Sequence, residues 1–155
     1  MKSTLKELFK SLDTTFLSLR PWQEKFSEYW EKCANSNLVG IQTPTGSGKT
    51  CVSLLILEQG RRNSKKCVYL THTKQLVERI AEEAHNLGIK YITLGSAKGI
   101  KGDKYRKRKQ AIDEYNDYEY IIISTFASFL MTPDFPLNVD ILVIDDVDLF
   151  YKILF

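Results

Sequence analysis

Residues 43–50 form a short glycine-rich loop between two apolar segments. They read Thr-Pro-Thr-Gly-Ser-Gly-Lys-Thr, with the apolar run 38–41 before them and the run 52–57 after them. Gly46 and Gly48 allow the backbone to curl so that successive N–H groups point toward one spot, and a following helix adds its positive N-terminal end. The pattern therefore predicts a buried strand, a tight loop and a helix, in that order.

Such a loop is suited to bind the phosphates of a nucleoside triphosphate. Lys49 supplies a mobile cation for the terminal phosphates, and the hydroxyl of Thr50 can ligate Mg²⁺. Thr43 stands at the first position, where the usual pattern has glycine, and the other positions of the pattern are met. We predict that the residues that hold ATP are Thr45, Gly46, Ser47, Gly48, Lys49 and Thr50.

A second polar group follows a later apolar segment. Residues 139–144 are mostly apolar and end in an Asp-Asp-Val-Asp sequence that begins at Asp145. One interpretation is that Asp145 holds Mg²⁺ through its water shell and that Asp146 orients or deprotonates the water that attacks the γ-phosphate. The other is a helix N-terminus, where capping and the helix dipole favour aspartate. The upstream loop favours the metal site.

The composition is that of a single globular domain. The chain has 155 residues, of which 43% are hydrophobic and 26% charged, and no apolar stretch approaches the length of a membrane span. The N-terminus lacks the compact apolar core of a signal peptide, so we expect a cytoplasmic protein without a membrane partner. Cys33, Cys51 and Cys67 are widely spaced in apolar surroundings, which favours buried, reduced thiols over disulfides or zinc ligands.

Basic residues gather in one part of a nearly balanced chain. The net charge is only +3, yet seven residues from Lys98 to Lys109 are lysine or arginine, against the single acid Asp103. This segment is either a solvated loop and helix face or a contact for the phosphates of a nucleic-acid strand.

Apolar and amphipathic segments alternate along the chain. An amphipathic helix is predicted up to Phe16, and a second helix, with a buried aromatic face, from Pro21. Further on we predict strands at 38–42, 67–71, 91–94, 120–124 and 139–144, and helices at 49–59, 76–87, 104–116 and 126–130. Near-continuous apolar strands that alternate with helices predict an α/β fold with a mostly parallel sheet and helices on both faces.

Five motifs follow one another in this order: Arg-Pro-Trp-Gln from Arg20, the loop at 43–50, Thr-His-Thr-Lys-Gln-Leu-Val from Thr71, Ser-Thr-Phe from Ser124, and the Asp-Asp-Val-Asp sequence. In order and spacing they resemble the first motor domain of superfamily 2 (DEAD/DEAH-like) helicases. The resemblance covers nearly the whole chain and implies one RecA-like, ATP-binding domain over residues 1–155. The Asp-Asp-Val-Asp form looks most like the helicase-like module of reverse gyrases.

The resemblance also implies roles for single residues. Gln23 would read the adenine edge, since an amide both donates and accepts; the alternative is an ordinary surface glutamine. Thr71, Thr73 and Lys74 would hold one nucleic-acid phosphate at the start of a helix, and Thr125 would hold a second. These threonines could instead be simple helix caps.

The chain departs from the family beyond the acidic motif. It stops at Phe155, whereas such helicases continue with a Ser-Ala-Thr-type motif and a second motor domain that supplies arginine fingers. In related folds the strand that leads to this motif lies between the phosphate-loop strand and the acidic strand, so we expect a gap in the sheet. We expect a truncated domain that lacks this motif, hydrolyses ATP poorly alone, and self-associates through the apolar residues 149–155.

The leading hypothesis is an ATP-binding, nucleic-acid-dependent motor domain, with DNA favoured over RNA as partner. A standalone adaptor that binds nucleotide and nucleic acid without motor activity is the alternative. A small-molecule phosphotransferase with the same loop is a third possibility. The Gln23 motif and the motif at Thr71 speak against it, because such enzymes have no need of either.

Overall fold

The computed structural model describes residues 3–33, 35–94, 110, 112–130 and 138–146. The elements in chain order are α1 (Leu5–Ser11), α2 (Pro21–Lys32), α3 (Lys49–Arg62), β1 (Cys67–Thr71), α4 (Lys74–Asn86), β2 (Tyr91–Leu94), β3 (Ile121–Thr125), α6 (Phe126–Leu130) and β4 (Ile141–Ile144). Residues 112–116 are also helical. Within the described ranges, no helix is both long and apolar enough to span a bilayer.

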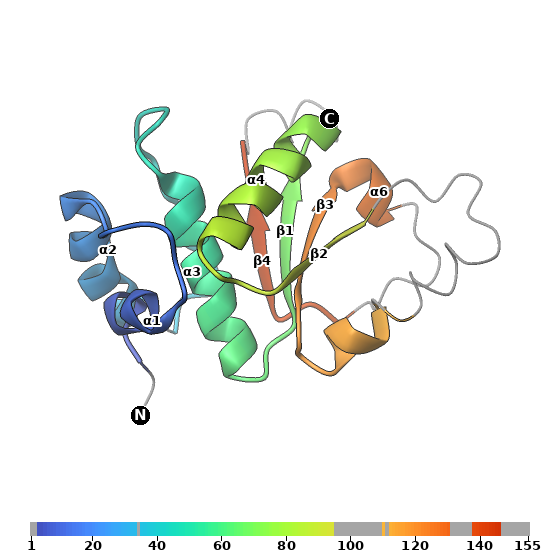
Figure 1. The fold of residues 1–155 in the computed structure, drawn as a ribbon, viewed down its shortest axis with the longest axis horizontal. Coiled ribbons are helices and arrows are strands. Elements are labelled where there is room, and N and C mark those ends of the chain that lie inside the picture. Colours follow the sequence, from blue (N-terminus) through green and yellow to red (C-terminus); the bar gives the residue numbers. More distant parts are fainter. Residues whose placement is uncertain (1–2, 34, 95–109, 111, 131–137, 147–155) are drawn as a thin grey trace.

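The four strands form one parallel sheet in the order β2-β3-β1-β4 (Figure 1). β1 is central: Tyr69 is paired with Ile123 of β3 on one side and with Val143 of β4 on the other. Because the strands run in the same direction, their carboxyl ends lie along one edge of the sheet. The predicted α/β fold with a parallel sheet is confirmed.

Helices cover both faces of the sheet. α3 and α4 pack on one face, with α1 and α2 beyond α3 (Figure 1). α6 packs against β3 and β1, and the helix at 112–116 contributes Tyr115, which is fully buried in one apolar cluster with Val68 and Ile122. The apolar run after the glycine-rich loop lies within α3, where Leu54 and Leu57 are completely buried. The helix that follows the loop is therefore anchored in the core.

The strand predicted at 38–42 is absent. These residues have no regular secondary structure, and Leu38 is 91% exposed. A cavity of about 980 Å³ is lined on one side by residues 39–43 and on the other by β4. A strand needs a neighbour that satisfies its backbone N–H and C=O groups, and no described strand lies between this segment and β4. The cavity occupies the place where we expected a gap in the sheet.

The prediction of a buried aromatic face on α2 holds only in part. Trp22, Phe26 and Trp30 are partly buried and pack against the core, whereas Tyr29 is 57% exposed. The buried residues of α2 are Gln23 and Ser27. The reason is the direction in which this helix faces: Ser27 Oγ accepts a hydrogen bond from the Lys6 N–H of α1 at 3.1 Å, and Gln23 turns toward the glycine-rich loop.

The three cysteines are free thiols, and two of them are buried as predicted. Burial raises the pKa of Cys51 and of Cys67 to about 12, so both stay protonated at neutral pH. Cys33, at the end of α2, is only partly buried, which corrects the expectation that all three would be.

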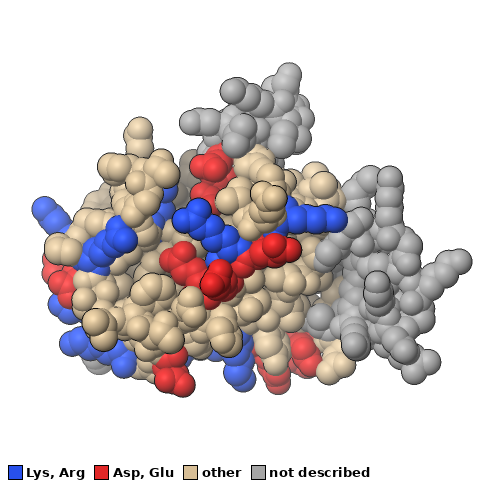
Figure 2. All heavy atoms as spheres, turned by 45° about the horizontal axis from the view of Figure 1, so that its top comes forward, with Lys and Arg blue, Asp and Glu red and all other residues tan. Residues whose placement is uncertain are grey.

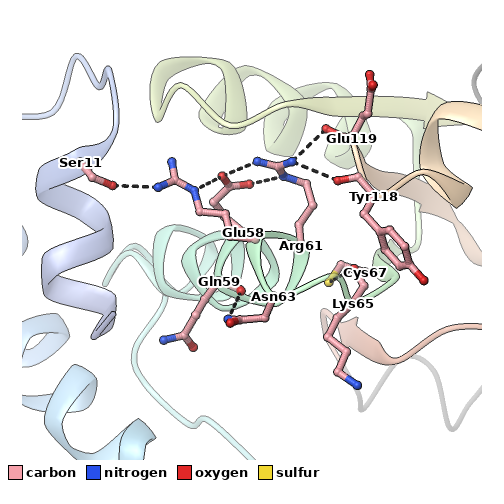
Figure 3. Close-up of polar contacts among 10 residues, drawn as sticks. Ser11, Glu58, Gln59, Arg61, Asn63, Lys65, Cys67, Tyr118 and Glu119 are labelled. Carbon is pink, nitrogen blue, oxygen red and sulfur yellow. Dashed lines mark hydrogen bonds and ion pairs between the residues drawn. The ribbon is translucent and has the colours of Figure 1, made fainter. Parts of the chain in front are cut away.

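A buried carboxylate near the C-terminal end of α3 joins three parts of the fold (Figure 3). Glu58, with a side chain only 2% exposed, accepts hydrogen bonds from Arg61 at 2.7 and 2.8 Å and from Arg62 at 2.8 Å. Arg62 also donates to Ser11 Oγ of α1, and Arg61 donates to two backbone carbonyl groups just before β3. The two arginines therefore tie α1 and the start of β3 to α3.

Candidate nucleotide-binding site

The glycine-rich loop adopts the conformation that its glycines predict. Gly46 and Gly48 have φ values of 76° and 94°, in the region that residues with a side chain rarely adopt. At Gly48 a Cβ atom would also lie only 2.6 Å from Gln23 Nε2. α3 begins at the next residue, Lys49, so the positive end of this helix faces the loop.

Three side chains at the start of α2 hold the loop by donating hydrogen bonds to three successive backbone carbonyl groups. Arg20 Nη1 donates to the Gly46 carbonyl at 2.7 Å, the Trp22 indole N–H to the Ser47 carbonyl at 2.8 Å, and Gln23 Nε2 to the Gly48 carbonyl at 2.9 Å. These hydrogen bonds hold the loop in shape. Sequence reasoning missed Arg20, although it begins the first motif.

Gln23 is not a surface glutamine. It is 5% exposed, and its Oε1 accepts a hydrogen bond from the Arg20 N–H at 2.7 Å while its Nε2 holds the Gly48 carbonyl. Both halves of the amide are therefore engaged. A role in reading adenine stays a prediction, and it requires one of these bonds to change partner when nucleotide binds.

The acidic residues follow β4 at the carboxyl edge of the sheet. Asp145 Oδ2 accepts a hydrogen bond from the Tyr69 hydroxyl at 3.2 Å, and its Oδ1 accepts one from the Asp146 N–H at 3.1 Å. Asp146 has a φ of 52°, a left-handed conformation that aspartate tolerates better than most residues. Its carbonyl group lies 3.1 Å from His72 Nε2. The backbone at Asp146 is therefore held at a sharp bend.

The structure brings the predicted cation and carboxylates to one cleft. Lys49, Asp145 and Asp146 line the cavity of about 980 Å³, together with Tyr69. Thr50 follows Lys49 in the first turn of α3. Hydroxyl and carboxylate oxygens are the ligands that Mg²⁺ prefers, so the residues present fit a nucleotide with this metal. The loop residues Thr45 and Gly46 are exposed beside the cleft.

Comparison with known proteins agrees with this geometry. The sequence model of the DEAD/DEAH box helicase family matches residues 20–153. The chain belongs to this helicase family. It is a first motor domain of the superfamily 2 type, and such domains generally use ATP with Mg²⁺. Among curated proteins, no match to the chain is found.

The threonines assigned to nucleic acid lie at the carboxyl ends of β1 and β3 of the helicase domain. Thr73 caps α4 by accepting a hydrogen bond from the Leu76 N–H at 3.2 Å, and Thr125 Oγ1 accepts one from the Ser128 N–H at 3.1 Å. Both are therefore helix caps, the alternative left open above. Thr71 is completely buried, and its hydroxyl has no hydrogen-bond partner among the residues that the structure describes.

Two of the residues assigned to nucleic acid line a second groove. Exposed Lys74 and buried Thr125 line a separate groove of about 630 Å³ between α4 and β2. The basic run from Lys98 to Lys109 falls outside the described residues. On the face shown in Figure 2, basic and acidic side chains are interspersed over the described surface, and no uniformly basic area is visible there.

Proposed function

We propose that this helicase domain binds ATP with Mg²⁺ in the cleft between the glycine-rich loop and β4, as part of a nucleic-acid-dependent motor. The main support is that Lys49, Asp145 and Asp146 line the same cleft although they belong to distant parts of the chain. Ligands of parallel α/β sheets bind at the carboxyl ends of the strands, and Asp145 and Asp146 follow the carboxyl end of β4.

Each residue has a distinct role in this proposal. Lys49 binds the terminal phosphates, and the backbone N–H groups of the loop bind the others. Thr50 and Asp145 hold Mg²⁺, which neutralises phosphate charge when bound. Asp146 orients or deprotonates the attacking water.

Fast hydrolysis needs a further group. None of the described residues that line the cleft is an arginine, and an arginine aimed at the γ-phosphate is worth roughly 10³ to 10⁵ in rate in related enzymes. We therefore propose that a second motor domain supplies this arginine. The domain alone would bind nucleotide and turn it over slowly.

The proposed nucleic-acid strand lies along the carboxyl edge of the sheet, near the N-termini of α4 and α6. Lys74 is exposed at the first turn of α4, where a phosphate is favoured by the helix dipole. The resemblance of the Asp-Asp-Val-Asp sequence to reverse gyrases favours DNA over RNA as the partner.

Thermal unfolding with and without MgADP tests the nucleotide site. A ligand at about a hundred times its Kd stabilises the folded state by about 2.7 kcal/mol, so we expect a clear rise in Tm. Lys49→Ala should remove this rise without lowering the Tm of the free protein, because Lys49 is only partly buried and has no resolved ion pair in the described structure. Lys90→Ala, an exposed lysine before β2, is the matched control. A parent protein that does not respond to MgADP would contradict the proposed function, and an unchanged response of Lys49→Ala would contradict the role of the loop.

A further inference from the structure

A tyrosine that the sequence did not single out contacts the carboxylate of the candidate metal site. Tyr69 lies in the middle of β1, is 1% exposed, and lines the cleft. Its hydroxyl donates a hydrogen bond to Asp145 Oδ2 at 3.2 Å. Asp145 follows β4, so Tyr69 links the central strand of the sheet to the acidic wall of the site.

The direction of this hydrogen bond follows from the chemistry of the two groups. An ionised carboxylate can only accept, so the Tyr69 proton points to Asp145.

The Asp145 carboxylate is fixed by the same arrangement. One oxygen accepts from Tyr69 and the other from the Asp146 N–H at 3.1 Å, so the carboxylate cannot rotate without breaking one of the two bonds. A carboxylate has about four acceptor positions, and the unused ones remain for the water shell of a metal ion.

We propose that Tyr69 is a positioning residue for the metal site, which orients the Asp145 carboxylate toward Mg²⁺. This inference rests on the proposed function of the cleft. Tyr69 acts through Asp145, in the way that hydrogen-bond partners of metal ligands commonly set the affinity of a site.

The experiment measures nucleotide binding against Mg²⁺ concentration, by calorimetry with ADP. Tyr69→Phe removes only the hydroxyl group. We expect it to raise the Mg²⁺ concentration for half-maximal enhancement of ADP binding by on the order of tenfold, the usual effect of such partners. ADP binding in excess chelator should stay unchanged. Tyr115→Phe is the matched control, because Tyr115 is equally buried and its hydroxyl lies 3.4 Å from the Asn138 carbonyl, in the cluster on the other face of the sheet.

The outcomes separate this inference from the proposed function. If the parent protein binds ADP with Mg²⁺ and Tyr69→Phe keeps the same Mg²⁺ dependence, Tyr69 is a core residue only and the inference is wrong. If the parent shows no Mg²⁺-dependent binding, the proposed function itself fails. Asp145→Asn provides a further check: the Mg²⁺ dependence should change little when Tyr69→Phe is added to it, because the hydroxyl acts through this carboxylate.

Discussion

At the scale of single residues, the shape of the site depends on the residues at the start of α2 as much as on the glycine-rich loop itself. Arg20, Trp22 and Gln23 hold three successive carbonyl groups of the loop, so the loop is preorganised before nucleotide arrives. Preorganisation lowers the entropy that binding must overcome. Sequence reasoning could name Gln23, because its motif is recognisable. It could not show that the amide is buried and already bonded on both sides, since that depends on how α2 approaches the loop.

Gln23→Ala tests this brace in the absence of nucleotide. The change leaves the Gly48 carbonyl and the Arg20 N–H without their side-chain partners, which should lower the free energy of unfolding by about 1–3 kcal/mol. Urea unfolding measures this loss. Gln75→Ala is the control: Gln75 is exposed in the first turn of α4, and its replacement should change stability by less than about 0.5 kcal/mol. Equal stability of the two variants would show that Gln23 contributes to ligand contacts alone.

At the scale of elements, hydrophobic periodicity predicted most of the structure. β1, β2 and α6 begin and end where the sequence predicts, and α3 is only slightly longer. Two segments differ from the prediction. α1 ends at Ser11, before the predicted end at Phe16, and the segment 38–42 has the apolar composition of a strand although it forms none. Periodicity reports which residues suit a sheet, but a strand also needs a hydrogen-bonding neighbour. Local sequence carries no information about that neighbour.

The Glu58 cluster, which consists of Glu58, Arg61 and Arg62, connects separate elements of the fold and was not predicted from the sequence (Figure 3). Glu58→Ala would leave two arginines without their buried carboxylate, and loss of one partner of a buried pair costs about 3–5 kcal/mol. We expect the lower end of this range, because the Arg62 side chain is 41% exposed. Chemical unfolding of Glu58→Ala measures the loss. Glu24→Ala is the control, since it removes an exposed ion pair with Lys6, worth at most about 1 kcal/mol. Similar losses in both variants would contradict a structural role for the cluster.

At the scale of the whole molecule, the strand order β2-β3-β1-β4 places β1 and β3 inside the sheet and β2 and β4 at its edges. β1 and β3 each have a neighbour on both sides and are buried throughout. β4 pairs only with β1 among the described residues, is partly exposed, and forms one wall of the cleft. The other wall is the irregular segment before the glycine-rich loop. The two walls of the candidate site, β4 and the segment before the loop, are therefore connected through α3 and β1.

Hydrogen exchange measured by mass spectrometry tests this division. Exchange of a buried strand requires wide unfolding, whereas an edge strand exchanges through smaller openings, so we expect peptides from β1 and β3 to exchange slowest and those from β4 to exchange faster. MgADP should slow exchange at residues 46–50 and 145–146 together, because the ligand would bridge both walls of the cleft. Residues 112–116, on the opposite face of the sheet, provide the internal control and should not respond. Equal protection of β4 and β1 in the free protein, or protection by MgADP at the loop alone, would mean that the two walls do not act as parts of one site.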